Sequence, residues 1–505
     1  MKNILQNFKQ DFSASIVVFF VALPLCLGIA LASGAPLFSG IIAGIVGGIV
    51  VGAASGSPLG VSGPAAGLSV LVLGYITSLG GSWEAFLLAV ILMGIIQIIA
   101  GFLKLGTIAY YFPSSVIKGM LSGIGLIIII KQIPHAIGYV KEFDNDFGTE
   151  NVSASQSWFE FSDMLNFITP NALIIALISM MILIIWEEVI TKKHKIFKAI
   201  PSPLVAVIAG IILSNFLELR NGQIVEIPVS ESLGEFLLQF KTPDISQVLN
   251  PQIYGIALVM AIVASLETLL CVEATDKLDP SKRVTPTNRE LKAQGLGNIV
   301  SGLIGGLPIT QVIVRSSANI TFGAKSKLST ILHGFLLLIS AIAIPNLLNM
   351  IPLATLACIL LVVGYKLVKP SIFKQMYKMG YEHFIPFIVT IIGMLVFDLL
   401  KGVGIGIVAA IIFILYNNFR NSFSRIEEKE GKNNKHIIKL SEEVSFLNKG
   451  SILQMLKEIP SDSTVIIDGS KSTSIHYDVI EIIQDFITNA KTKNISVEIK
   501  GINLK

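Results

Sequence analysis

Charged residues are scarce in this chain: Asp, Glu, Lys and Arg together make up 14% of its 505 residues, whereas hydrophobic residues make up 52%. Soluble globular domains carry roughly 25% charged residues. The shortage excludes an ordinary soluble protein and predicts one that crosses a lipid bilayer several times. The net charge of +4 gives no basis for binding nucleic acid.

Cysteine and histidine are too few and too scattered to predict a disulfide framework or a metal site. The three cysteines (Cys26, Cys271 and Cys358) lie in apolar segments, where they resemble small buried hydrophobic residues, and the six histidines show no metal-ligand spacing. The sequence also has no phosphate-binding glycine loop, nucleophile elbow or zinc-protease motif. These absences argue against an ATP-driven pump or a hydrolase, and they predict a chain that is not an enzyme and has no resident cofactor.

Long apolar segments fill the first 420 residues. A helix needs about 20 apolar residues to cross the hydrocarbon core, and fewer when it is broken within the membrane. By this measure the sequence predicts a membrane all-α domain over 1–420 with fourteen transmembrane segments, of which the third and tenth are short. The segments are 12–33, 36–54, 63–78, 84–103, 109–137, 171–190, 200–217, 250–272, 288–304, 309–322, 328–345, 350–367, 382–400 and 402–419.

The loops between these segments differ in charge. Lysine and arginine gather in 191–199, in 277–290 and near the turn after segment twelve, whereas 141–169 and 218–249 carry more acidic than basic residues. The positive-inside rule places basic loops in the cytoplasm. Fourteen crossings then predict a protein of the cell (inner) membrane with both termini cytoplasmic and the two acidic loops outside.

Corresponding landmarks recur in the two halves of the membrane domain. Pro24 and Pro64 lie 40 residues apart in segments one and three, and Glu267 and Pro308 lie 41 apart in segment eight and before segment ten. Seven segments separate each landmark from its counterpart. Because seven is odd, the second half must run in the opposite direction through the membrane, which predicts a 7+7 inverted repeat.

The sequence changes character after Phe419. A charged stretch over 421–435 is expected to be a linker. Residues 436–505 then alternate short apolar runs typical of strands (HIIKL, VSFLN, STVIIDG, ISVEIKG) with helical spacing in GSILQMLKEI and DVIEIIQDFITNA. We therefore expect a small cytoplasmic α/β domain there.

The two short segments begin in sequence typical of broken helices. The first helix start lies at Pro64, Ala65 and Ala66, and the second runs through Thr310, Gln311 and Val312. A helix that starts within the membrane presents unpaired N–H groups and the positive end of its dipole, so two facing starts can bind an anion. The alternative is a pair of re-entrant turns packed inside the protein.

Two ionisable residues lie at membrane depth near these starts. Glu267 has no basic residue within a turn of helix, so its carboxylate is expected to take up a proton or hold a cation; a structural carboxylate is the alternative. Arg315 follows the second start by a turn and a half. It could supply positive potential for an anion or pair with a carboxylate such as Glu267.

Several motifs resemble the sulfate permease family of anion transporters. They are SLETLL, DKLDPSKR, NRELKAQGLGN, GGLP and VRSSANI followed by GAKSKLSTILHG within 265–334, together with GVSGPAAGLSVLV and ALPLCLGIALASG nearer the N-terminus. The resemblance spans most of 1–420. It implies a core domain (segments 1–4 and 8–11) that moves against a gate domain (5–7 and 12–14), and a STAS-like domain after the membrane part.

The resemblance also implies roles for particular residues. In this family an acidic residue at the position of Glu267 is linked to proton or sodium coupling, and a hydroxyl one turn later is here Cys271, a poor sodium ligand. Val312 and Ile313 replace an alanine and a threonine of the bicarbonate carrier. STAS domains that act as phosphorylation switches place a serine where Ser470 lies, although a polar turn is the alternative.

Together these features predict secondary active transport of a small inorganic anion, bicarbonate or sulfate, with Na⁺ or H⁺ as the coupling ion. The family further implies a homodimer and a functional partnership with carbonic anhydrase. An anion channel or sensor is one alternative, and coupling through Glu267 discriminates against it. A nucleobase carrier of the same architecture is another, but it calls for a carboxylate in segment ten, where this chain has Gln311 and Arg315.

Overall fold

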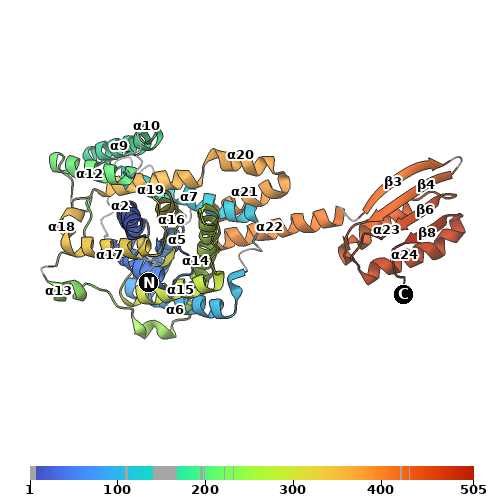
Figure 1. Ribbon diagram of the computed structural model, residues 1–505, viewed down its shortest axis with the longest axis horizontal. Helices are drawn as coiled ribbons and strands as arrows, with labels where there is room; N and C mark the ends of the chain where they lie inside the picture. Colours follow the sequence, from blue (N-terminus) through green and yellow to red (C-terminus); the bar gives the residue numbers. More distant parts are fainter. Residues whose placement is uncertain are drawn as a thin grey trace. The chain divides into compact units, whose positions relative to one another are not determined.

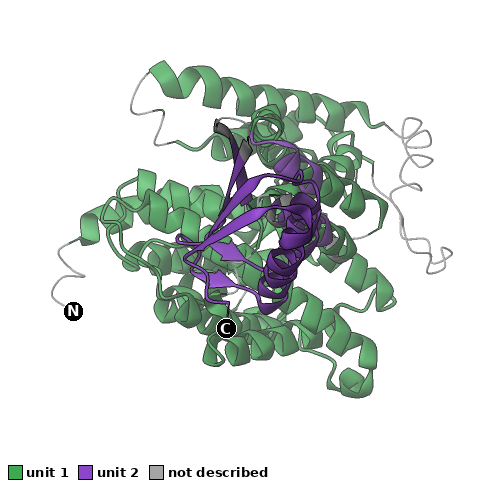
Figure 2. Cartoon of the chain, turned by 90° about the vertical axis from the view of Figure 1, so that its right-hand side faces the viewer, with its two compact units in different colours: residues 1–378, 387–405 green, residues 379–386, 406–505 purple. Residues whose placement is uncertain are grey.

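The computed structural model describes residues 7–107, 112–139, 168–193, 197, 200–220, 222–230, 232–397, 399–420, 423–430 and 433–504. The chain divides into two compact units (Figure 2). Unit 1 comprises Met1–Lys378 and Phe387–Ile405, and unit 2 comprises Met379–Pro386 and Gly406–Lys505. Most of the predicted loop 141–169 lies outside the described residues.

Helices occupy most of the membrane part (Figure 1). The first half contains α2 (Phe8–Ala32), α3 (Leu37–Val46) with a π-helical turn (Gly47–Val51) and α4 (Gly52–Ala54), α5 (Ala66–Ser78), α6 (Trp83–Phe102), α7 (Ser114–Ala136), α9 (Pro170–Ile185) with a second π-helical turn (Trp186–Ile190) and α10 (Thr191–Lys193), and α12 (Ser202–Phe216). The second half contains α13 (Leu233–Leu238), a 3-10 turn (Ile245–Leu249), α14 (Pro251–Leu278), α15 (Thr287–Leu303), α16 (Ile313–Thr321), α17 (Leu328–Ala343), α18 (Pro345–Leu348), α19 (Leu353–Leu367), α20 (Pro370–Lys378), α21 (Tyr381–Val396) and α22 (Leu399–Arg420). Each of the fourteen predicted segments coincides with a helical segment, which confirms the sequence-based fold class.

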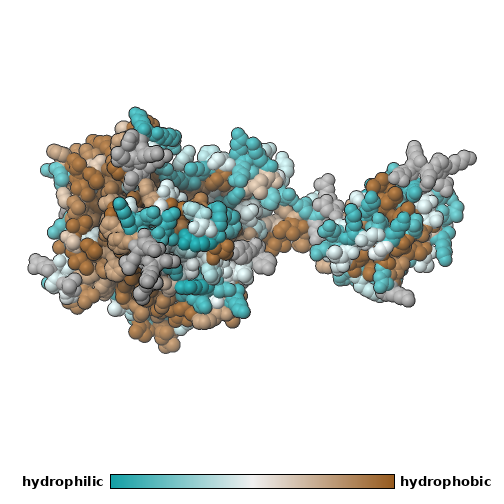
Figure 3. Space-filling view, in the orientation of Figure 1, coloured by the Kyte–Doolittle hydropathy of each residue, from teal (hydrophilic) through white to brown (hydrophobic). Residues whose placement is uncertain are grey.

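The helices are apolar enough for a bilayer. Seven helical stretches of the described chain are long and apolar enough to cross a membrane, and five shorter apolar helices accompany them. Apolar side chains cover much of the surface of unit 1 (Figure 3), as the 81% exposed Phe216 on α12 illustrates. Such a surface suits contact with lipid and is unusual in water.

Two three-residue strands lie among these helices. β1 (Ser62–Pro64) pairs antiparallel with β2 (Ile309–Gln311), with Ser62 opposite Gln311 and Pro64 opposite Ile309. β1 leads into α5 and β2 leads into α16. Equivalent elements of the two halves therefore run in opposite directions, as an inverted repeat requires.

Glycines allow helix backbones to approach one another around this sheet. A Cβ built on Gly94 of α6 would lie 2.5 Å from the Gly295 carbonyl oxygen of α15, and a Cβ on Gly295 would meet the Gly94 carbonyl at the same distance. Gly48 in the π-helical turn after α3 and Gly334 on α17 allow a similarly close approach of these two backbones. Such contacts hold membrane helices together where hydrophobic burial supplies little driving force. α6, α15, α3, α2 and α17 consequently form a closely packed group.

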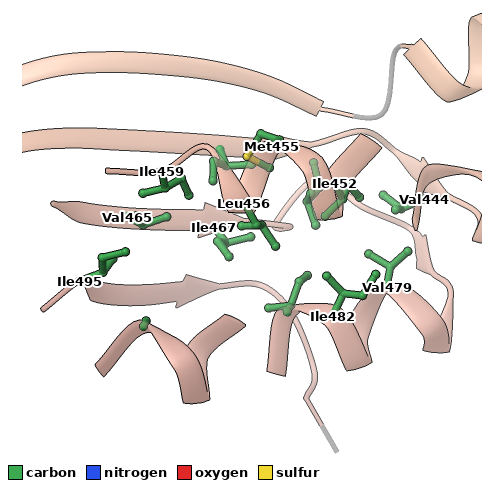
Figure 4. Packing of buried hydrophobic residues seen from close by; sticks show 14 residues of the cluster. Val444, Ile452, Met455, Leu456, Ile459, Val465, Ile467, Val479, Ile482 and Ile495 are labelled. Carbon is green, nitrogen blue, oxygen red and sulfur yellow. The ribbon is translucent and has the colours of Figure 1, made fainter. Parts of the chain in front are cut away.

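Unit 2 contains a four-stranded sheet in the order β3-β4-β6-β8. Its elements are β3 (Phe423–Glu430), β4 (Asn433–Leu440), β5 (Glu443–Val444), a 3-10 turn (Phe446–Asn448), α23 (Lys449–Lys457), β6 (Thr464–Asp468), β7 (Ser474–Ile475), α24 (Tyr477–Ala490), a 3-10 turn (Lys491–Lys493) and β8 (Ser496–Lys500). β4, β6 and β8 are parallel. The two helices pack on the sheet through aliphatic residues such as Ile452, Ile467 and Val479 (Figure 4).

Two expectations for this region need correction. Residues 421–435 were expected to be a charged linker, but 423–430 and 433–440 form an antiparallel hairpin, in which Phe423 pairs with Leu440 and Ile426 with Ile437. The high charge suggested a linker, but an edge strand such as β3 can also carry many charged residues, because their side chains remain in water. VSFLN is mostly a 3-10 turn, with only Val444 in a short strand.

Candidate functional site

The helices α5 and α16 start at the β1–β2 sheet without side-chain caps. Ala65 and Val312 are the N-cap residues, both with extended backbone, and neither side chain accepts a hydrogen bond from the turn that follows. The helices begin at Ala66 and Ile313, slightly later than the sequence suggests, and Pro64, Thr310 and Gln311 lie in the strands. Because the strands are antiparallel, the helices diverge in opposite directions while both N-termini remain at the sheet. This is the arrangement that concentrates positive helix ends.

Glu267 on α14 lies beside the first turn of α5. A Cβ built on Gly67 would be 2.6 Å from Glu267 Oε1, so the carboxylate rests against the helix backbone. Its Oε2 atom is buried and has no hydrogen-bond partner among the described residues. The side chain as a whole is partly exposed. The structure therefore brings the predicted coupling residue to the predicted anion site.

Cys271 lies one helical turn after Glu267 on the same face of α14. Its thiol lies close to the backbone N–H of Ile313, the first residue of α16. α14 thus presents Glu267 to the start of α5 and Cys271 to the start of α16, and it contacts both helices (Figure 1). The two candidate coupling residues span the two halves of the site.

Arg315 is fully buried against Gly63 of β1. A side chain at Gly63 would collide with its Nη1 atom, and its Nη2 atom donates to Cys26 Sγ of α2 at 3.4 Å. Nε and Nη1 have no partner in the described residues, and no ion pair there joins Arg315 to Glu267. Of the two predicted roles, the geometry fits positive potential behind the sheet better than pairing with Glu267, since a buried charge without a counter-ion favours a nearby anion.

The two polar side chains of β2 are inaccessible. Thr310 and Gln311 are buried, and Gln311 donates from Nε2 to Thr275 Oγ1 at 3.1 Å. Ala66 at the start of α5, Val312 and Ile313 at the start of α16, and Glu267 on α14 are partly exposed. The two helix starts and Glu267 are therefore accessible, whereas Thr310 and Gln311 are not.

Side chains of α15, α14 and α6 hold the outer edge of β2 in place. Asn298 on α15 accepts from the Ile309 N–H at 2.7 Å and donates to the Ile309 carbonyl at 3.1 Å. The Gln311 N–H donates to Thr268 Oγ1 at 3.3 Å. Asn298 also donates to Gln97 Oε1 on α6 at 2.8 Å. These bonds satisfy strand groups that would otherwise be unpaired within the membrane. In the sequence, amide side chains within otherwise apolar segments are the feature that could have indicated these residues.

A second polar chain anchors β1. Gln294 on α15 donates to Ser62 Oγ at 2.8 Å and to Glu290 Oε1 at 2.9 Å. The buried Glu290 carboxylate accepts in turn from Ser55 Oγ at 2.5 Å and from the Gly56 N–H. α15 therefore positions both strands, through Asn298 and Gln294 one turn apart.

Ser470 lies far along the chain, in an exposed turn after β6 of unit 2. Its backbone N–H donates to Asp468 Oδ1 at 2.9 Å, and the hydrogen bonds from Ser470 hold the pKa of that carboxyl below its usual value. The turn packs against Gly501, where any side chain would collide with Ser470. Both the phosphorylation site and the simple polar turn remain compatible with this position.

In the described part of the chain, no group of three His, Cys, Asp or Glu side chains could hold a metal ion. Within those residues, the arrangement supports binding through helix ends and a buried cation.

Comparison with known proteins agrees with this geometry. The chain is 28% identical to Bacillus subtilis YvdB over 420 residues, which are 81% of this chain and 74% of YvdB. It is also 28% identical to the bicarbonate transporter BicA of Picosynechococcus over 416 residues, 80% of this chain and 70% of BicA. The solved structure of SLC26A9 superposes with a TM-score of 0.78 at 18% identity and covers 98% of this chain and 84% of its own, which shows a shared fold that includes the α/β unit.

The profile of the sulfate permease family matches residues 8–392, which include β1, β2 and the helices α2, α3, α14 and α15 that contact them. The match confirms the resemblance drawn from the motifs around Glu267 and Arg315, and with the apolar helices it identifies a multi-pass membrane protein. This chain belongs to the sulfate permease family.

Proposed function

We propose that the chain carries a small inorganic oxyanion, bicarbonate or sulfate, across the cell membrane by secondary active transport. The observation that carries the proposal is the meeting of two uncapped helix starts at the β1–β2 sheet, with Arg315 buried behind them. Backbone N–H groups and helix dipoles bind oxyanions without a cationic side chain at the surface. The family and the names of the relatives support a transporter and not an enzyme.

Glu267 is the residue that we propose binds the coupling ion. Its carboxylate rests on the first turn of α5, so its charge acts directly on the helix start that binds the anion. A proton suits this seat better than Na⁺, because Cys271 is a poor sodium ligand and Gly67 offers no side-chain oxygen. Uptake of the anion is then linked to the protonation state of Glu267.

The way the helices group supports alternating access. α6 packs on α15 and α14, and α2 packs on α3 and α17; α19 packs on α7 and α9, and the two groups meet where α2 contacts α19 and α5 contacts α7. The first group carries the binding site and the second closes it on either side, so movement between the groups would expose the site alternately. The proposed topology has both termini in the cytoplasm. A homodimer and cooperation with carbonic anhydrase belong to this proposal as well.

Uptake into proteoliposomes tests the binding site. Labelled bicarbonate and sulfate are offered with imposed H⁺ or Na⁺ gradients. Ala66→Phe should reduce uptake at least tenfold, because its ring would cover the N–H groups that start α5. Gly74→Phe is the matched control on the same helix, since a Cβ there meets nothing within 4 Å. Equal uptake by both variants would place the anion site elsewhere.

Glu267→Gln tests coupling and separates a carrier from a channel. The variant should lose concentrative uptake while retaining anion binding and passive exchange, since the helix starts are unchanged. It should also lose the pH dependence of uptake. Glu273→Gln is the control, because Glu273 lies on the same helix and pairs with Lys277 at 2.6 Å. Undiminished accumulation by Glu267→Gln would leave Glu267 a structural carboxylate.

A further inference from the structure

A cavity of about 460 Å³ lies apart from the β1–β2 site. One wall comes from the end of α2 and from Leu73 on α5, and the other from the last turns of α7 and the start of α19. None of its lining residues belongs to β1, β2 or α14. It therefore lies between the two groups of helices, two turns along α5 from Ala66.

Gln132 is the unusual residue of this cavity. The side chain of Gln132 lines the cavity, is 1% exposed, and has no hydrogen-bond partner for either Oε1 or Nε2 among the described residues. Burying an amide without partners is unfavourable, because its donor and acceptor lose their hydrogen bonds to water. The amide offers a donor and an acceptor side by side to whatever enters the cavity.

Charge and size restrict the ligand class. Lys131 lines the same cavity from α7, so the positive charge of its ammonium group favours an anion there. The remaining wall is mainly aliphatic, with Leu31, Leu73 and Leu353 among its members. Cavities of about 300–1,000 Å³ suit drug-sized organic molecules, and an inorganic oxyanion would leave most of this one empty.

We propose that this cavity binds an organic 2-hydroxycarboxylate with an apolar body. The carboxylate accepts from Gln132 Nε2 near Lys131, the hydroxyl donates to Gln132 Oε1, and the apolar body contacts the leucine wall. Binding of this ligand does not depend on the proposed function, whereas the expected inhibition of transport rests on it. A ligand held between α5 and α7 opposes relative movement of the two helix groups and so inhibits transport.

Calorimetry on the full chain in lipid nanodiscs tests binding, with mandelate as the probe. Mandelate should bind, and phenylacetate, which lacks the hydroxyl, should bind at least fivefold more weakly. Phenethylamine carries the opposite charge and should not bind. Gln132→Leu should weaken mandelate at least tenfold, whereas Ile130→Leu, a lipid-exposed neighbour on α7, should leave it unchanged.

A second variant and a competition measurement separate loss of the cavity from loss of folding or of the anion site. Leu73→Trp fills the cavity from α5 and should abolish mandelate binding; this variant serves if Gln132→Leu melts at a much lower temperature than the wild type. Mandelate should still bind in the presence of saturating sulfate or bicarbonate and to Ala66→Phe. Absence of mandelate binding, equal affinity of Gln132→Leu, or competition with the inorganic anions would overturn the proposal. Loss of anion uptake in all preparations with mandelate binding intact would instead count against the proposed function alone.

Discussion

Replacing Asn298 with alanine should weaken anion binding, although Asn298 holds β2 in place and is not itself one of the proposed anion-binding residues. In β2, the Ile309 N–H and carbonyl both point to the Asn298 side chain, because alternate residues of an antiparallel strand turn their backbone groups away from the partner strand. Asn298→Ala leaves both backbone groups unpaired within the membrane. A buried group that loses its partner costs about 1–3 kcal/mol, and measured bonds between membrane helices average about 0.6 kcal/mol. A combined loss of about 2 kcal/mol is therefore expected.

That loss must appear in stability or in binding. If β2 keeps its place, the cost lowers the melting temperature of the purified protein. If β2 shifts to find new partners, the start of α16 moves with it, and about 2 kcal/mol corresponds to a roughly 30-fold weaker anion affinity. Melting curves measure the loss of stability, and sulfate or bicarbonate titrations on the same sample measure the loss of anion affinity.

Gln97→Leu is the matched control for this prediction. It removes the neighbouring bonds to Asn298 and to Ser265 Oγ but leaves both contacts to Ile309. Its total effect should be less than half that of Asn298→Ala. An Asn298→Ala protein with wild-type melting and wild-type anion affinity would refute the assignment of Asn298 as the residue that positions β2.

Two further predictions concern topology and pH. Single cysteines at the exposed Val229 and Lys471 in a cysteine-free background should react from outside and from inside the cell, respectively; the opposite labelling pattern would reject the proposed orientation. Burial raises the pKa of Asp279, but bonds from Arg283 and the Ser281 N–H outweigh it and hold the pKa below its ordinary value. The stabilisation is therefore present at neutral pH and lost as the pH falls through the lowered pKa. Asp279→Asn should melt below the wild type at pH 7, and the difference should shrink as the pH falls below the ordinary pKa of an aspartate; a constant difference would contradict this.

The sequence predicted the helical part of the fold well, because its main signals are local. Apolar length, Gly/Pro breaks and loop charge located all fourteen helical segments and both helix starts. The predicted linker failed because pairing between Phe423 and Leu440 is a property of two strands, and charge alone resembles a linker when one face of an edge strand is in water.

The site was only partly predictable for a related reason. Glu267 stood out as a carboxylate without a local partner, and its place beside Gly67 agrees with that interpretation. The bonding of Gln311 to Thr275 and the role of Asn298 depend on which helix lies behind the sheet, over separations in sequence that no spacing rule covers. A residue type can reveal that a polar group needs a partner, but only the packing reveals which partner it has.

The pairing of β1 with β2 also constrains how the protein is made. Val61 and Ser316, which hydrogen-bond beside the sheet, are 255 residues apart. At about 5–20 residues per second, synthesis reaches the second strand roughly 13–50 s after the first. During that interval β1 has no partner strand, although α14 and α15, which reach α5 and β1 through Glu267 and Gln294, are made before β2. The nascent chain therefore holds β1 without its ladder until β2 is made, and truncation between α15 and β2 should leave the backbone groups of β1 unpaired.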